Sequence, residues 1–166
     1  MSKLQAIYLG IGANLSISGH DNPKSGCLAA IDFLTADGAI TLDAISPWYR
    51  TAPVPVSDQP WFYNAVLKIK TELSPSDLIQ RIHNVEAEMG RVRLVRNEAR
   101  VIDIDIIDYA GLINKSNPIL PHPRMHQRAF VLYPLRDVAS DWVHPVSGLG
   151  IEDLIAGLED QNIHPE

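Results

Sequence analysis

Two aspartates in a β-like run are the residues best suited to chemistry. Residues 101–107 are Val-Ile-Asp-Ile-Asp-Ile-Ile, and strand geometry places Asp103 and Asp105 on one face, about 6.6 Å apart along the chain. At an effective dielectric of about 20 their repulsion is roughly 2.5 kcal/mol, which favours a nearby cation without requiring one. Carboxylates suit Mg²⁺, which completes its shell with water and phosphate oxygens. A polar, solvated strand face explains the spacing equally well.

Arginine is concentrated just before this strand. Four arginines fall within ten positions of a chain whose formal net charge is −6: Arg91, Arg93, Arg96 and Arg100. Positive charge focused on an acidic background favours a small, highly charged anion as ligand. Guanidinium groups bind a polyphosphate through bidentate contacts, and phosphoryl transfer relies on charge stabilisation by a metal and arginine. The alternative is a structural network of salt bridges.

Two further segments combine side chains of the right type. The loop that follows Thr51 and includes Val54 leads to Phe62 and Asn64, which could enclose a flat heterocycle and hydrogen-bond its edge. Residues 122–130 hold His122, Arg128 and Phe130 close together in sequence. Taken alone, these two segments are explained better by core aromatics next to a loop and by a polar turn before a helix.

The pattern along the chain predicts alternating strands and helices. Turn residues and apolar periodicity predict strands at 7–12, 64–73 and 101–107, of which the second has one buried face. They predict helices from Pro23 to about Gly38, between Ser74 and Gly90, and at 130–138. A β-like run at 39–51 is expected to be interrupted or at an edge because it contains Pro47, and residues 54–60 are expected to form a loop.

The helix between Ser74 and Gly90 has the clearest boundaries in the sequence. Ser74 is the expected N-cap, with a proline in the next position, and Gly90 stands where a C-terminal glycine belongs. Its apolar stripe faces the core. His83 and Glu86 lie together on a neighbouring face, where we expect them to be free to contact a ligand.

This order of elements predicts an α+β sandwich of ferredoxin-like type, in which helices cover one face of a mainly antiparallel sheet. We expect a single domain over residues 1–158 and a loose polar tail over 159–166. The chain has 166 residues, of which 46% are hydrophobic and 20% charged, which is typical of one globular domain.

Composition also excludes several classes of protein. The acidic balance argues against nucleic acid as a bulk partner. No apolar run approaches the roughly 20 residues of a membrane helix, and the first residues lack a secretory signal, so we expect a cytoplasmic protein. The single cysteine, Cys27, excludes an internal disulfide and a zinc site built of several thiolates.

Familiar nucleotide and acyl-transfer motifs do not fit. Gly10-Ile11-Gly12 begins like a dinucleotide fingerprint, but Leu15 stands where the third glycine belongs. The Walker lysine pattern is absent, and no serine lies in a nucleophile-elbow setting.

Taken together, the motifs resemble the 6-hydroxymethyl-7,8-dihydropterin pyrophosphokinase family of folate biosynthesis over essentially the whole chain. The resemblance lies in five blocks that occur in the family's order: Gly12-Ala13-Asn14-Leu15, Ser46-Pro47-Trp48-Tyr49-Arg50-Thr51-Ala52-Pro53, Gln59-Pro60-Trp61-Phe62-Tyr63-Asn64-Ala65, Gly90-Arg91-Val92-Arg93 with Arg100-Val101-Ile102-Asp103-Ile104-Asp105, and Leu120-Pro121-His122-Pro123-Arg124-Met125.

The resemblance implies transfer of the pyrophosphoryl group of ATP to the pterin hydroxymethyl oxygen, with release of AMP. Asp103 and Asp105 would hold two Mg²⁺ ions, and Arg91 and Arg100 would stabilise charge during transfer. The implied pterin-binding residues are Thr51, Val54, Phe62, Asn64 and Phe130. The implied ATP-binding residues are His83, Glu86, Arg93, Arg100, His122 and Arg128. These small molecules would be the partners of a monomer that binds neither nucleic acid nor membrane.

Two other functions stay open at this point. Asn97-Glu98-Ala99 stands where many family members have Trp-Gly-Pro, which is the argument for a catalytically weakened relative that binds a pterin or a nucleotide. A ferredoxin-like sandwich could also bind RNA, but that requires exposed aromatics and a basic sheet face, where this chain places aspartates.

Overall fold

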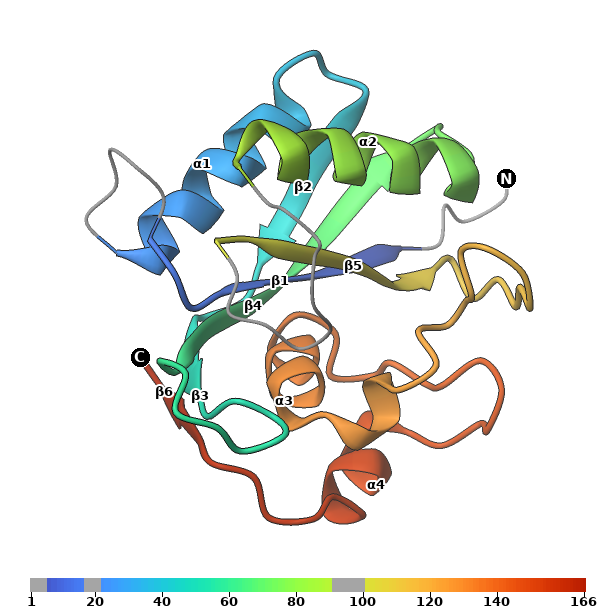
Figure 1. Ribbon diagram of the computed structural model, residues 1–166. Coiled ribbons are helices and arrows are strands. Elements are labelled where there is room, and N and C mark those ends of the chain that lie inside the picture. Colours follow the sequence, from blue (N-terminus) through green and yellow to red (C-terminus); the bar gives the residue numbers. More distant parts are fainter. Residues whose placement is uncertain (1–5, 17–21, 91–100) are drawn as a thin grey trace.

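The structure is a computed structural model that describes residues 6–16, 22–90 and 101–166. Its elements follow the order β1 (Ile7–Ala13), α1 (Pro23–Thr35), β2 (Ile40–Ile45), β3 (Tyr49–Thr51), β4 (Phe62–Thr71), α2 (Pro75–Glu88), β5 (Asp103–Tyr109), a 3₁₀ turn η1 (Met125–Gln127), α3 (Ala129–Val138), α4 (Ile151–Ala156) and β6 (Ile163–Pro165). This arrangement confirms the predicted α+β class, with an antiparallel sheet and helices packed against it (Figure 1).

The sheet is antiparallel at every described pairing and is built around the long strand β4. The strand order is β5-β1-β4-β3-β6, and β2 also pairs with β4. Because β2 and β3 pair with different parts of β4, the run predicted at 39–51 forms two strands separated around Pro47, as the proline indicated.

Helices α1 and α2 cover one face of the sheet, and their boundaries follow local signals. The Asn22 side chain accepts a hydrogen bond from Ser25 N, and Ser74 accepts one from Asp77 N, so each helix begins at a capped residue followed by proline. Gly90 has φ +87°. Helices often end at a residue in this left-handed conformation, which glycine adopts most easily. The core on this face includes Leu9, Leu34, Leu67, Ile82 and Ile104.

The opposite face is also partly covered, which corrects the prediction of helices on one face only. Helices α3 and α4 pack there, over a second core that includes Tyr8, Val66, Ile107, Leu132 and Leu135 (Figure 1). The strand at 64–73 was expected to bury one face only, but Val66 on its other face is fully buried because α3 lies over it. None of the helices in the described ranges combines the length and apolar character of a membrane crossing.

Residues 159–166, predicted as a loose polar tail, include a short strand. Residues Ile163–Pro165 form β6, which pairs with the short strand β3 and lies beside it in Figure 1. The tail is polar, as its sequence shows, but backbone hydrogen bonding to an available sheet edge does not depend on apolar side chains.

The second core contains a buried polar cluster. Asp108 accepts hydrogen bonds from Trp142 Nε1 at 2.9 Å and from Gly111 N at 3.0 Å, and burial raises the pKa of this carboxyl above its usual value. His144 is 8% exposed, and its Nδ1 accepts hydrogen bonds from Val146 N and Ser147 N at 3.1 and 3.2 Å. His144 must be neutral at this nitrogen to accept them.

Replacing His144 by asparagine is expected to make folding less sensitive to acid. Burial lowers the pKa of His144 below 6.5, His126 adds to the lowering, and Asp108 opposes it. The neutral form therefore stabilises the fold fully above the unfolded pKa of about 6.5, and this contribution is lost as the pH falls toward the folded pKa. Asparagine Oδ1 keeps an acceptor but does not titrate. Urea unfolding at pH 7.5 and 5.5 should show a smaller loss of free energy in H144N than in the wild type.

The exposed His83 provides the matched control, because H83N replaces a histidine without touching this cluster. Equal losses of unfolding free energy in H144N and the wild type would show that His144 does not carry the effect.

Candidate functional site

The register of three central strands brings polar residues into one row across the second face of the sheet. Gly12 of β1 lies opposite Asn64 of β4 on one side and opposite Asp103 of β5 on the other. Two residues further along β1, Gly10 lies opposite Asp105. Side chains two apart in a strand share a face, so Asn64, Asp103 and Asp105 all lie on the face that α3 covers only in part.

A pocket opens where this row is left uncovered. It has a volume of about 110 Å³, and its lining residues come from four parts of the chain: β1, the β3–β4 segment, β5 and the start of α3. It brings together all five predicted pterin-binding residues, one predicted metal ligand and one predicted ATP-binding residue, namely Thr51, Val54, Phe62, Asn64, Phe130, Asp103 and Arg128. The pocket is small beside typical ligand cavities of about 300–1,000 Å³, which favours a compact ligand.

The apolar and hydrogen-bonding parts of the pocket are organised around Asn64. Its Nδ2 donates a hydrogen bond to Thr51 Oγ1 at 2.6 Å, and both residues are buried. Phe62 and Phe130 are half-buried and line the same pocket. Their rings lie beside a fixed amide, which is an arrangement suited to a flat heterocycle with a polar edge.

The charged part of the site lies around β5. His122 Nε2 is 4.0 Å from Asp105 Oδ2, too far for a hydrogen bond. His122 Nδ1 accepts a hydrogen bond from Arg124 N at 3.2 Å, which leaves the proton of the neutral ring on Nε2. Burial, followed by Arg128 and Arg124, lowers the pKa of His122 to about 4, while Asp103 raises it. At neutral pH this histidine is therefore a hydrogen-bond donor without a charge.

Arg128 joins the two halves of the pocket. It precedes α3, and its guanidinium carbon lies 5.3 Å from the centre of the Phe130 ring. The contact holds a positive charge beside an aromatic wall and near Asp103. An anionic group bound here would reach arginine on one side and a carboxylate, through a cation, on the other.

Glu86 does not lie on a free helix face as predicted. It is 1% exposed, and its Oε2 accepts a hydrogen bond from Ile104 N at 3.1 Å. Since β5 is an edge strand, Glu86 satisfies an outward N–H that lies between Asp103 and Asp105 and holds the backbone that carries them. His83 is exposed on α2, as predicted. Contact of either residue with ATP stays a prediction.

Part of the predicted site lies outside the described residues. Arg91, Arg93 and Arg100, together with Glu98, fall in the range 91–100. The roles assigned to them from sequence stay predictions. Among the described residues, no cluster of three or more histidine, cysteine, aspartate and glutamate side chains could hold a metal ion.

The β1 glycines and Asn14 shape the site, although the sequence predicted no role for them. A Cβ on Gly12 would lie 2.2 Å from Asn64 Oδ1, so only glycine leaves room for that amide. Asn14 is 2% exposed and donates to Gln59 Oε1 and to the Pro60 carbonyl, which anchors the loop before Phe62. Glycine inside a strand pattern was an available signal, since it often marks a close approach of another group.

The family model described as 7,8-dihydro-6-hydroxymethylpterin-pyrophosphokinase (HPPK) matches residues 8–140. A relative from Methylorubrum extorquens, 2-amino-4-hydroxy-6-hydroxymethyldihydropteridine pyrophosphokinase, is 39% identical over 94% of this chain and 95% of its own length. The chain belongs to the HPPK family. A protein of the same name from Haemophilus influenzae is 36% identical over 94% of both chains.

Other similar proteins are much longer than this chain. The folic acid synthesis protein fol1 of Pneumocystis carinii is 39% identical over 97% of the chain, which spans 21% of that protein. A crystal structure of HPPK-DHPS in complex with substrates superposes with a TM-score of 0.70 at 13% identity, covering 93% of this chain and 45% of that one. This likeness supports the HPPK fold, and the match at residues 8–140 contains every predicted site residue.

Substituting alanine for Gly12 should destabilise the HPPK domain by about 1–3 kcal/mol, as overpacking of a tight site typically does. The new Cβ would meet Asn64 Oδ1 at 2.2 Å and the Tyr63 carbonyl oxygen at 3.2 Å, and would break the Asn64–Thr51 hydrogen bond. Urea denaturation measures the loss.

G150A is the matched control. A Cβ at Gly150 would have its nearest neighbour, Asp153 Oδ2, at 3.8 Å, and the backbone there has negative φ. A stability loss in G12A no larger than that in G150A would contradict the close-packing argument.

Proposed function

We propose that this chain transfers the pyrophosphoryl group of ATP to the hydroxymethyl oxygen of 6-hydroxymethyl-7,8-dihydropterin and releases AMP, in folate biosynthesis. One observation carries the proposal. A single pocket holds Phe62, Phe130 and Asn64, which suit a flat heterocycle, beside Asp103 and Arg128, which suit a phosphate chain. Membership of the HPPK family supports the choice of a hydroxymethyl pterin and ATP as the two substrates that such a pocket would bring together.

The pterin would lie between the aromatic side chains. Phe62 and Phe130 would stack on its two faces, and Asn64 with the backbone near Thr51 and Val54 would meet its polar edge. The Asn64–Thr51 hydrogen bond supports this role because it fixes the amide before any ligand arrives. The hydroxymethyl group would then point toward the β5 aspartates.

Two Mg²⁺ ions are the cofactor we infer for Asp103 and Asp105. The residues fit the ion: two carboxylates stand on one open strand face, and Mg²⁺ commonly takes one or two protein carboxylates while phosphate and water fill its other positions. When bound, the ions would neutralise phosphate charge and ease deprotonation of the attacking hydroxyl. Gly10 and Gly12 face these aspartates across the sheet, so β1 adds no side chain that could pair with them.

In the transfer, the hydroxymethyl oxygen would bond to the β-phosphorus of ATP while the bond from that phosphorus to the α–β bridging oxygen breaks. The electron pair and the charge leave with AMP, and the hydroxyl proton passes to solvent or to a nearby base. Arg128 and the neutral His122 would hold ATP, and Arg93 and His83 would assist. Arg91 and Arg100 would stabilise the charge that develops during transfer.

The decisive experiment follows the label of γ-³²P-ATP in the presence of Mg²⁺ and the hydroxymethyl pterin. Pyrophosphoryl transfer predicts that AMP appears and that the label moves to the pterin. Formation of ADP, or hydrolysis that does not depend on the pterin, would reject the proposed function.

Substitution of asparagine for Asp105 should reduce kcat by at least about a hundredfold, because one metal-binding charge is lost where transition-state charge develops. Tm should change little, because the side chain is 40% exposed. Steady-state kinetics with a Mg²⁺ titration and a thermal melt measure the two effects.

D43N is the control for loss of a surface carboxylate. Asp43 lies on β2, outside the pocket lining, and pairs with Lys68 and Lys70 of β4. Exposed ion pairs of this kind contribute little. Unfolding of D105N, or near-normal turnover, would show that the aspartate pair is not the metal site.

A further inference from the structure

The last six residues of the chain contact both walls of the pterin pocket. We call residues 161–166 the C-terminal strap. It includes β6, and it lies outside the residues that the family model matches. The strap reaches the loop after β3, which forms one wall of the pocket, and the start of α3, which forms the other.

Gln161 caps α3 from a distant part of the chain. Its Oε1 accepts a hydrogen bond from Ala129 N at 3.0 Å, and its Nε2 donates to the Gln127 carbonyl oxygen at 2.9 Å. Arg128, at the N-cap position of α3, provides no side-chain cap. The first N–H of a helix has no partner within the helix, and Ala129 is 3% exposed. Gln161 therefore replaces the missing local cap immediately beside Arg128 and Phe130.

The next residue holds the opposite wall. Ala52 N donates a hydrogen bond to the Asn162 carbonyl oxygen at 3.0 Å. The two walls are thus attached to adjacent residues, Gln161 and Asn162, whose Cα atoms are only about 3.8 Å apart. The separation between the Phe130 side and the Thr51–Val54 side of the pocket therefore depends on this pair of attachments.

The rest of the strap is anchored firmly enough to transmit this constraint. Ile163, His164 and Pro165 pair with Thr51, Arg50 and Tyr49 of β3. The His164 ring stacks on Trp61, the neighbour of Phe62, with ring centres 5.8 Å apart and planes 5° from parallel. At the end of the strap, Glu166 pairs with Lys24 at 2.7 Å, but this ion pair is partly exposed and contributes little to the anchoring.

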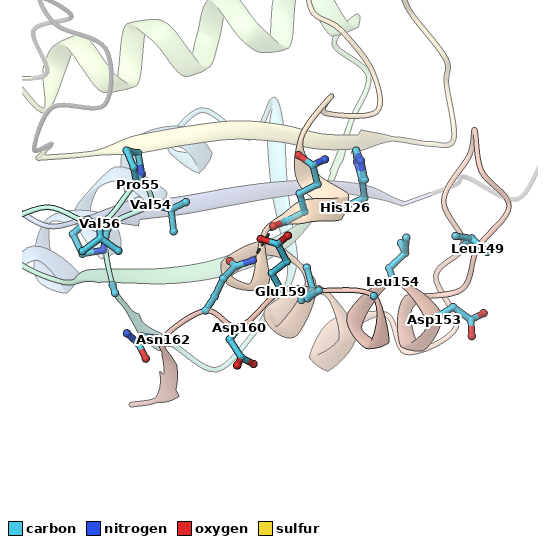
Figure 2. Close-up of a pocket in the computed structure, with 16 residues that line it drawn as sticks. Val54, Pro55, Val56, His126, Leu149, Asp153, Leu154, Glu159, Asp160 and Asn162 are labelled. Atoms are coloured by element: carbon cyan, nitrogen blue, oxygen red, sulfur yellow. Dashed lines mark hydrogen bonds between the residues drawn. The ribbon is translucent and has the colours of Figure 1, made fainter.

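The loop after β3 also borders a second, larger hollow, on the side away from the pterin pocket. On that side the strap supports the loop. Figure 2 shows Val54, Pro55 and Val56 along one side of this hollow and Leu154 of α4 on another, with Asn162 from the strap nearby. Its volume is about 790 Å³. The loop therefore has the pterin pocket on one side and open space on the other, and Val56 is 90% exposed.

We propose that Gln161 is a positioning residue that fixes the width of the pterin pocket by tying the start of α3 to the strap that also holds Ala52. The inference rests on the proposed function, because it names a determinant of pterin binding at that same site. Gln161 does not line the pocket itself. It acts through Ala129, and so through Arg128 and Phe130.

Replacing Gln161 by alanine removes the cap and should raise KM for the hydroxymethyl pterin about tenfold, the scale expected when a buried N–H loses its acceptor. The value of kcat should fall less than about threefold, because the β5 aspartates are untouched. Q161E keeps an acceptor for Ala129 N and should restore most of the pterin affinity. E166A, on the same strap but at the Lys24 contact, should leave KM for the pterin unchanged.

Two measurements without turnover accompany the kinetics. Pterin Kd is determined by calorimetry at a temperature well below Tm, and hydrogen exchange of the Ala129 and Ala52 amides is followed in the ligand-free protein. Support for the proposal requires faster exchange at Ala129 and a raised Kd in Q161A, with both effects reversed in Q161E.

The outcomes separate this inference from the proposed function. If the wild type forms AMP while Q161A binds pterin as the wild type does, the positioning role is wrong and the proposed function stands. If the wild type binds pterin but forms no AMP, the proposed function fails and the Kd comparison still decides the role of Gln161. A lowered Tm in Q161A with unchanged Kd would make Gln161 structural only, and a wild type that binds no pterin would overturn both.

Discussion

The register of the pairing among β4, β1 and β5 is the constraint on which the rest of the site depends. It places Asn64, Gly12 and Asp103 in one row, and Asp105 one step along the same face. A slip of one residue would exchange every side chain between the two faces. Asn64 and the aspartates would then enter the core under α1 and α2, where unpaired polar groups are costly. Burial of alternating isoleucines such as Ile104 therefore fixes the position of the polar residues between them.

The site exists because the second face of the sheet is covered only in part. Helices α1 and α2 exclude water from the first face along its whole core, whereas α3 and α4 cover the part of the second face around Val66 and Ile107. The uncovered part carries the polar row, and its neighbours are loops and a helix start. Such a boundary gives a ligand an apolar wall, a fixed amide and access to solvent at once, which is the usual composition of a small-molecule site.

Local signals allowed much of this structure to be predicted from the sequence. Pro23 predicted where α1 begins, and Ser74 with the proline after it predicted where α2 begins. Alternation predicted β4 and β5, and the ordered blocks predicted the family. The failures share a physical cause. Burial of Val66 depends on α3, burial of Glu86 on the edge of β5, and the order of the tail on β3. Each is a contact between segments far apart in sequence, and no local pattern encodes such a contact.

The basic residues of the site differ in whether they carry a charge at neutral pH. Burial and neighbouring arginines keep the pKa of His122 at about 4, so at neutral pH this side chain provides a hydrogen bond and no charge. A cation bound between Asp103 and Asp105 would act in the same direction, because positive charge near an imidazole disfavours its protonation. In the proposed reaction, the charge that balances the triphosphate would then come from metal ions and from arginine, whose guanidinium does not titrate. Among the described residues, Arg128 is placed to supply this positive charge, since it lines the pocket beside Asp103.

The position of Arg128 depends on the start of α3, and the start of α3 depends on a cap from the end of the chain. The polar tail thus takes part in the electrostatics of a site to which it contributes no charge.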